Sequence, residues 1–171
     1  MALQTSATDV LVLNAGSSSI KFAVFDADLN QTLSGIAEGI GQISKITIGT
    51  EVENTPFIDH RAALSAVLEQ LKIKGFSLTA LAAVGHRVVH GGSKLKQPVR
   101  LTLEVRAEIN NCTPLAPLHN PHNLAAIDML SELAPDVPQY ASFDTSFHTT
   151  NPAVATRYAI PRMIETKGIR R

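Results

Sequence analysis

The alternation of apolar and polar residues predicts two paired strands at the beginning of the chain. The apolar run at 10–13 leads into the turn sequence Asn-Ala-Gly-Ser-Ser-Ser, and a short run closed in this way is typical of a buried strand. Residues 20–26 place apolar side chains at every second position, which predicts a half-buried strand that returns from the turn. Residues 33–38 and 45–50 show weaker strand patterns.

Three helices are predicted in the rest of the chain. Apolar side chains recur at helical spacing over residues 60–74, and Asp59 is suited to cap the first turn of this helix. Residues 101–110 are expected to form a second helix. The third is predicted to begin near Pro121, a residue type that favours the first turn, with Asn120 as its cap.

Two further strands, over 81–89 and 138–143, alternate with these helices. An order of strands followed by alternating helices and strands predicts an α/β sheet with a leading hairpin and mixed pairing. Ligands of such sheets bind near strand ends, and Asn14, Val89 and Asp144 each stand at a predicted strand end. We therefore expect the functional site there.

Composition and charge narrow the class of protein. The 171 residues are 44% hydrophobic and 18% charged, which argues against disorder, and no apolar run approaches the ~18 residues of a membrane span. Lys plus Arg equals Asp plus Glu at 15 each, so the whole molecule has no net attraction for nucleic acid or anionic membranes. Anion binding must therefore come from a local arrangement of residues.

The cysteine content and the beginning of the chain bear on localisation. The single cysteine, Cys112, allows no internal disulfide and is compatible with a reducing compartment. Residues 1–9 are polar and lack a basic segment followed by an apolar one, so no signal peptide is expected. These features, with the length, lead us to expect one domain of a soluble cytoplasmic protein.

The turn over 14–21 is the first candidate for chemistry. Its glycine and three serines present backbone amides and hydroxyls that suit a phosphate, and Lys21 adds a positive charge. Asn14 offers a neutral oxygen to a magnesium ion or its water. The turn lacks the Gly-Lys-Ser/Thr ending and the following helix of a Walker loop. The alternative is an ordinary polar hairpin turn with a solvated lysine.

The second candidate is the segment 85–92, in which alternation places Arg87 and Val89 on one face of a strand. An arginine on a buried strand needs an anionic partner or a route to water, and that partner can be a substrate carboxylate or phosphoryl group, or an internal Asp or Glu. Val89 can shape a small apolar wall. His86 and His90 lie on a strand with no Glu between them, so we interpret them as structural or hydrogen-bonding residues and not as metal ligands.

Two more residues complete the inventory. His119 stands between two prolines ahead of a helix N-terminus, where it can donate to a phosphoryl oxygen; alternatively, His119 and His122 only cap and hydrogen-bond the loop. Asp144 at a strand end can hold magnesium water or orient an arginine, or it is a simple cap. A phosphate loop, an arginine, a histidine and an aspartate near strand ends suit phosphoryl transfer.

Four segments, 12–21, 85–92, 115–121 and 143–148, closely resemble the acetate kinase family, in the family's order and at similar separations. The likeness runs from about Val10 to the last residue. It implies a ribonuclease-H-like domain of the acetate and sugar kinase, Hsp70 and actin superfamily. It also implies reversible, magnesium-dependent transfer, with manganese as a substitute, between ATP and acetate, giving ADP and acetyl phosphate.

The resemblance also implies roles for single residues on the phosphate side. Asn14 would lie near the metal. Ser17, Ser19 and Lys21 would lie along the phosphate path of ATP.

On the substrate side, the resemblance implies that Arg87 binds the carboxylate or the transferring phosphoryl group. Val89 and Leu118 would line the pocket for the acetate methyl group. His119 would support the phosphoryl site, and Asp144 would be catalytic through the metal or the arginine.

Length is the departure from the family, whose members are more than twice as long. Beyond residues 168–171 the family continues into an essential histidine and a nucleotide domain with a second essential arginine and a metal-binding glutamate. We therefore interpret 1–171 as an N-terminal acetate-kinase-like domain that lacks the nucleotide-binding domain, folds, and is inactive alone. The full-length protein would be a homodimer with no nucleic-acid or membrane partner.

Two alternative functions stay open. A propionate or butyrate kinase of the same superfamily would differ only in the length of the acyl group that it accepts. One methylene group gives an apolar pocket only about 1–3 kcal/mol of discrimination between two substrates. The other alternative is a non-catalytic phosphate-binding or regulatory module.

Overall fold

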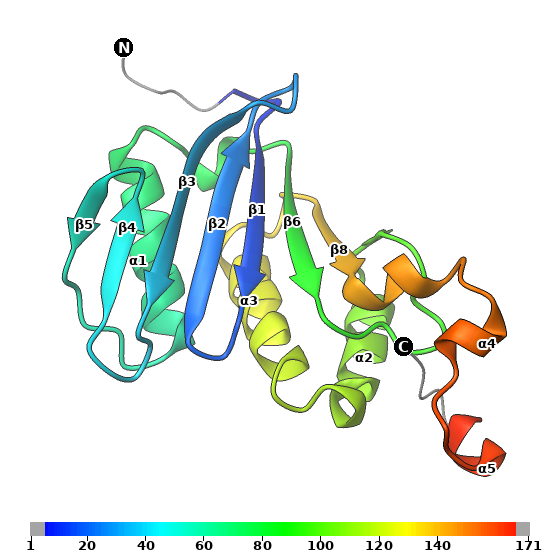
Figure 1. The fold of residues 1–171 in the computed structure, drawn as a ribbon. Helices are drawn as coiled ribbons and strands as arrows, with labels where there is room; N and C mark the ends of the chain where they lie inside the picture. The colour runs from blue at the N-terminus through cyan, green and yellow to red at the C-terminus, as the bar shows by residue number, and fades with distance from the viewer. Residues whose placement is uncertain (1–5, 167–171) are drawn as a thin grey trace.

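The computed structural model describes residues 6–166 and shows one eight-stranded mixed sheet with its three longest helices against one face (Figure 1). Residues 1–5 and 167–171, on which parts of the signal-peptide and chain-length expectations rest, lie outside the described residues. The strands are β1 (Val10–Ala15), β2 (Ser19–Phe25), β3 (Gln31–Glu38), β4 (Lys45–Ile48), β5 (Glu51–Glu53), β6 (Ala83–Val88), β7 (Val99–Arg100) and β8 (Gln139–Phe143). The helices are α1 (His60–Ile73), α2 (Leu103–Asn111), α3 (Asn120–Leu133), α4 (Ala153–Thr156) and α5 (Arg162–Glu165), with 3-10 turns η1 (Leu78–Ala80), η2 (Thr113–Leu115) and η3 (Asp144–His148).

The strand order is β5-β4-β3-β2-β1-β6-β8-β7. β1 pairs antiparallel with β2 and parallel with β6, and β6 pairs parallel with β8. The expected mixed α/β sheet with a leading hairpin is confirmed. Because β1, β6 and β8 run in the same direction, their carboxyl ends meet at one edge of the sheet, where we expected the site. The short strands β5 and β7 were not predicted, since three and two residues are too few to show a period.

Burial shows that only one face of the sheet is covered. In β1, Leu11 and Leu13 are fully buried, whereas Val12 is 38% exposed. The expectation of a fully buried strand is therefore wrong for Val12, because α1, α2 and α3 all lie on the other side of the sheet (Figure 1). In β2 the expected alternation is confirmed, with Ile20 and Val24 buried.

All three predicted helix beginnings hold at or near the expected residue, since α3 begins at Asn120, one residue before Pro121. The Asp59 side chain accepts a hydrogen bond from the Ala62 amide at 2.8 Å, so it caps α1 as predicted. α2 begins at Leu103, two residues later than expected, because the Thr102 side chain takes the cap position and accepts from the Val105 amide.

The expected cap of α3 is wrong. His119 occupies the cap position without a side-chain hydrogen bond to the helix, and Asn120 is the first helical residue. The Asn120 side chain is fully buried and is bonded to main-chain groups outside the helix.

The core has two parts that share α3. One lies between α1, α3 and strands β1–β4, and the other between α2, α3 and strands β6 and β8. α3 thus packs behind the point where β1 and β6 meet, and this position brings its first turn to the strand ends. Within residues 6–166, no helix is both long enough and apolar enough to span a membrane.

Candidate active site

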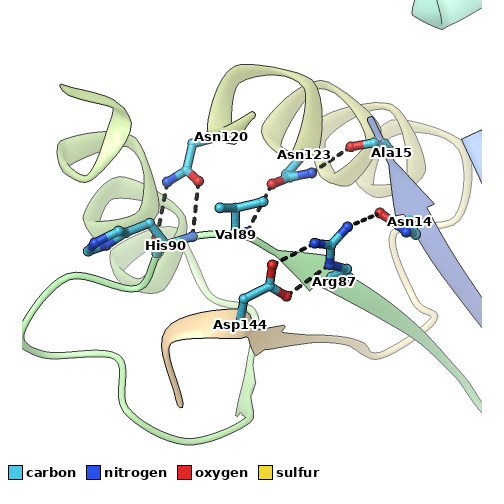
Figure 2. Close-up of polar contacts among 8 residues, drawn as sticks. All are labelled: Asn14, Ala15, Arg87, Val89, His90, Asn120, Asn123 and Asp144. Carbon is cyan, nitrogen blue, oxygen red and sulfur yellow. Dashed lines mark hydrogen bonds and ion pairs between the residues drawn. The ribbon is translucent and has the colours of Figure 1, made fainter. Parts of the chain in front are cut away.

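The guanidinium group of Arg87 connects residues at the ends of three strands, β1, β6 and β8. Its neighbours His86 and Val88 point into the core, so alternation leaves Arg87 on the open face of β6. Its Nε and Nη2 donate to the two carboxylate oxygens of Asp144 at 2.8 and 2.6 Å, and its Nη1 donates to Asn14 Oδ1 at 3.0 Å (Figure 2). Three residues predicted from separate motifs therefore meet. Arg87 therefore has the internal acidic partner that was considered for it, and this partner, Asp144, is itself a candidate site residue.

The Arg87–Asp144 pair is half-exposed, with side-chain exposures of 50% and 40%. Hydrogen bonding to Asp144 raises the pKa of Arg87, and burial opposes this shift in part. Such an exposed pair contributes at most about 1 kcal/mol to stability. The pair therefore matters less for stability than for orientation, because Asp144 holds the plane of the half-exposed Arg87 guanidinium.

The turn after β1 lies at the same edge. Lys21 is paired with Asn14 across the β1–β2 hairpin, so both side chains are on the open face. The turn is closed by the Gly16 amide, which donates to the Ser19 carbonyl at 2.8 Å. Ser17 and Lys21 are exposed and Ser19 is half-buried. This placement is compatible with both a phosphate-binding turn and a polar hairpin, and the roles of these residues stay predictions.

Two asparagines that were not predicted as site residues hold the segment after β6. Asn123 Oδ1 accepts from the Val89 amide at 3.3 Å, and its Nδ2 donates to the Ala15 carbonyl at 2.7 Å. Asn120 bonds both main-chain groups of His90, at 3.2 and 3.1 Å (Figure 2). Their spacing of three puts both on one face of α3. That spacing was the available signal, but polar residues in a first helical turn are too common to be informative.

Leu118 and His119 lie in the loop before α3, and their side chains are exposed. His119 is exposed at the cap position of α3, and Leu118 is 72% exposed, so the described residues do not close a pocket between Leu118 and the half-buried Val89. His122 stacks on His60 with ring centroids 4.2 Å apart. Burial, together with the nearby His60 and His119, lowers the pKa of His122.

His60 was not predicted as a site residue. Its Nε2 lies 2.7 Å from the Gly16 carbonyl, which connects α1 to the turn. Since a carbonyl can only accept, Nε2 carries the proton of this bond.

His86 and His90 have the hydrogen-bonding roles expected of them. His86 Nε2 lies 2.8 Å from Gln139 Oε1, and burial lowers the pKa of His86 to about 4. His90 Nδ1 accepts from the Gly92 amide at 2.9 Å.

Comparison with known proteins places this geometry in a family. Residues 9–171 match the Acetokinase family. The chain belongs to the acetokinase family. The resemblance found in the four motifs is thereby confirmed.

Among acetokinase relatives, the acetate kinase of Streptomyces avermitilis is 47% identical over 165 residues, which are 91% of this chain and 41% of the relative. The acetate kinase of Streptomyces coelicolor is 45% identical over 177 residues, or 97% and 44%. The chain therefore spans less than half the length of the curated relatives it matches.

Solved structures agree on the acetokinase fold. Porphyromonas gingivalis acetate kinase superposes with a TM-score of 0.86 at 38% identity, covering 96% of this chain and 44% of that one. A propionate kinase from Francisella tularensis gives 0.85 at 34%, covering 95% and 44%. The expected fold, the ribonuclease-H-like fold of the acetate and sugar kinase, Hsp70 and actin superfamily, is confirmed.

The oxygens of Asn14 and Asp144 are the groups of this acetokinase edge that suit magnesium. Within the part of the chain that the structure describes, no three His, Cys, Asp or Glu side chains cluster as a complete metal site. Magnesium commonly uses one or two carboxylates, waters and substrate phosphates. The oxygens of Asn14 and Asp144 lie at the same edge and accept from Arg87, so a magnesium ion held there would take one or two ligands from these residues and the rest from substrate phosphates and water.

Proposed function

We propose that the protein to which this chain belongs is a kinase for short carboxylic acids. It transfers the γ-phosphoryl group of ATP to acetate: an oxygen of the carboxylate forms a bond to phosphorus, the bond to the β,γ-bridging oxygen breaks, and ADP leaves. The observation that carries the proposal is the convergence of Arg87, Asp144 and Asn14 at one edge of an acetokinase sheet.

Arg87 would bind the negative charge of the reacting groups. Its fork is held in plane by Asp144 yet half-exposed, so a substrate carboxylate or phosphoryl group can reach it. Donors fixed before the reaction stabilise developing charge without reorganising, and one such donor is typically worth about 3 kcal/mol. Asp144 would act by orienting Arg87 and by offering an oxygen to magnesium.

Asn14, Ser17, Ser19 and Lys21 would form the phosphate side of the site. Lys21 and Asn14 share the open face of the hairpin, Ser17 stands in the turn beside them, and Ser19 is the first residue of β2. Magnesium, or manganese, would neutralise phosphate charge next to Asn14 and Asp144. His119 at the beginning of α3 would donate to a phosphoryl oxygen.

The acyl specificity is proposed to depend on Val89 and Leu118. An acetate kinase and a propionate kinase superpose on this chain almost equally well, with TM-scores of 0.86 and 0.85, so the fold does not choose between the two acids. Propionate is therefore the second candidate substrate. We further propose that residues 1–171 are the N-terminal domain of a cytoplasmic homodimer whose remainder binds the nucleotide; the length of the relatives, of which the match covers 41%, supports only that the protein continues beyond this domain.

The test is a chimera in which the matched 91% of this chain replaces the matched 41% of the Streptomyces avermitilis enzyme. It is assayed for acetyl phosphate with ATP, magnesium and acetate in a host without acetate kinase. We expect turnover within about 100-fold of that enzyme, because a displacement of about 1 Å caused by the exchange can cost a factor of this order. The same exchange with the Deinococcus radiodurans segment shows that the junction is tolerated. A folded chimera without turnover, beside an active control, would favour the non-catalytic module.

A further inference from the structure

We propose that Asn123 is a positioning residue that sets the separation between the two walls of the site. One wall is the end of β1 with its turn, which carries Asn14, and the other is the segment after β6, which carries Val89. The inference rests on the proposed function for its consequence, and on the contacts of Asn123 for its geometry.

The two walls diverge from a point that the sheet defines. β1 and β6 are paired in parallel from Val10 and Ala83 as far as Leu13 and His86. Beyond that pair the direct ladder ends, and the side chain of Asn123 enters the gap. Its Nδ2 donates to the Ala15 carbonyl at 2.7 Å and its Oδ1 accepts from the Val89 amide at 3.3 Å (Figure 2).

A carboxamide suits this place because it offers a donor and an acceptor in one plane, as a peptide group does. Asn123 is 3% exposed, so water does not readily replace it, and losing it leaves the buried Ala15 carbonyl and the half-buried Val89 amide without these partners. The bond from Arg87 to Asn14 spans the same two strands on the open face. The gap is therefore fixed from the helix side by Asn123 and from the open side by Arg87.

The neighbouring Asn120 shows what is particular to Asn123. Asn120 is equally buried on the same face of α3, but it bonds His90 and the Ile109 carbonyl and does not reach β1. Of these two side chains, only Asn123 joins the wall formed by the end of β1 to the wall formed by the segment after β6. Phosphoryl transfer in line is sensitive to such spacing, since a displacement of about 1 Å can cost roughly 100-fold in rate.

The experiment compares Asn123→Ala and Asn123→Asp with the parent chimera. For Asn123→Ala we expect kcat to fall at least about tenfold while the KM values for acetate and ATP change less than about threefold, since each wall is intact and only their spacing is altered. Ser131→Ala is the matched control. It removes another side-chain bond between α3 and the sheet, to Gln139 at 2.8 Å, and should leave kcat within about twofold.

Asn123→Asp tests the positioning role through the pH dependence of kcat, which would not change if Asn123 only stabilised the fold. An ionised carboxylate opposes the Ala15 carbonyl, whereas a protonated one can donate to it and still accept from Val89. Burial favours the protonated form, so the ratio of variant kcat to parent kcat should rise at least about threefold from pH 8 to pH 6. If Asn123→Ala fails to fold, this variant of the same shape carries the test alone.

A second measurement separates this inference from the proposed function. In the 171-residue chain, Asn123→Ala should accelerate hydrogen exchange of the Val89 amide at least about tenfold and leave the Val84 amide, bonded to the Pro138 carbonyl, unchanged. If Asn123→Ala accelerates Val89 exchange but the parent chimera is inactive, the proposed kinase function is refuted, while the role of Asn123 in joining Ala15 to Val89 is retained. An active chimera whose Asn123→Ala variant retains the parent kcat, or an Asn123→Asp ratio independent of pH, overturns the positioning role.

Discussion

The guanidinium of Arg87 and the carboxylate of Asp144 form a two-point ion pair across the adjacent carboxyl ends of β6 and β8. A second fork of the same kind joins Arg106 of α2 to Asp128 of α3, on the helical layer. The two pairs have similar exposure, so their chemistry is matched and their positions differ. That contrast supplies the control for the first prediction.

Arg87→Ala should lower kcat/KM for acetyl phosphate formation in the chimera by at least about 100-fold, because a fixed donor to developing charge is worth roughly 3 kcal/mol. The free energy of unfolding should change by no more than about 1 kcal/mol, since the pair is half-exposed. Steady-state kinetics and urea unfolding measure both. Arg106→Ala should match the stability change with normal turnover; a near-normal rate for Arg87→Ala removes this residue from the site.

Val89→Ala should shift the ratio of kcat/KM for propionate to that for acetate roughly tenfold toward propionate, because about one methylene of room is gained. Val52, which is 60% exposed on β5 at the far edge of the sheet, provides the control Val52→Ala. Both acids are assayed with each variant. An unchanged ratio would mean that Val89 does not limit acyl length.

The 171-residue chain by itself should fold and form no acetyl phosphate. Transfer requires ATP, metal and carboxylate held in line, and the cluster around Arg87 stands half-exposed at an open edge, where water weakens its charge interactions. Circular dichroism checks folding, and the acetyl phosphate assay, with host enzyme excluded, checks activity. Turnover at an ordinary kinase rate would show that the reaction requires no residues other than these 171.

His86 should make stability depend on pH between about 6.5 and 4. Burial lowers the pKa of folded His86 from 6.5 to about 4, so in this window the unfolded chain binds more protons and stability falls as pH falls. The total loss from this group is roughly 3 kcal/mol. His86→Gln does not titrate and should show a shallower decrease in urea unfolding from pH 7 to pH 4. Equal slopes for variant and parent would contradict the assignment.

Gly85 and Gly91 belong to one sequence motif yet should respond differently to alanine. A methyl group at Gly91 would overlap the Leu95 carbonyl oxygen, whereas one at Gly85 would meet Val12 Cγ2 at an ordinary 3.8 Å. Gly91→Ala should therefore reduce the free energy of unfolding by about 1–3 kcal/mol, and Gly85→Ala should change it by less than about 0.5 kcal/mol. Thermal or urea unfolding decides, and equal effects would show that the loop after β6 adapts.

The sequence by itself determined the longer strands and helices, but not β5, β7, α4 and α5, and it determined the residues of the Arg87 cluster. Alternation predicted β2 and left Arg87 opposite the buried His86, and Asp59 predicted the beginning of α1, because these signals depend on a residue and its near neighbours. Strand ends marked Asn14, Val89 and Asp144, since residue type and position in the chain suffice to place a polar group at an end.

Tertiary structure alone decided which of these groups touch. Nothing local distinguishes Asp144 from other acids as the partner of Arg87; that pairing follows from β8 lying beside β6. The same holds for Asn120, expected as a cap and found buried, and for Asn123, which joins Ala15 to Val89 across 108 and 34 positions of the chain. Val12 is exposed for the same kind of reason, because a strand's pattern shows which residues are apolar but not which faces of the sheet other elements cover.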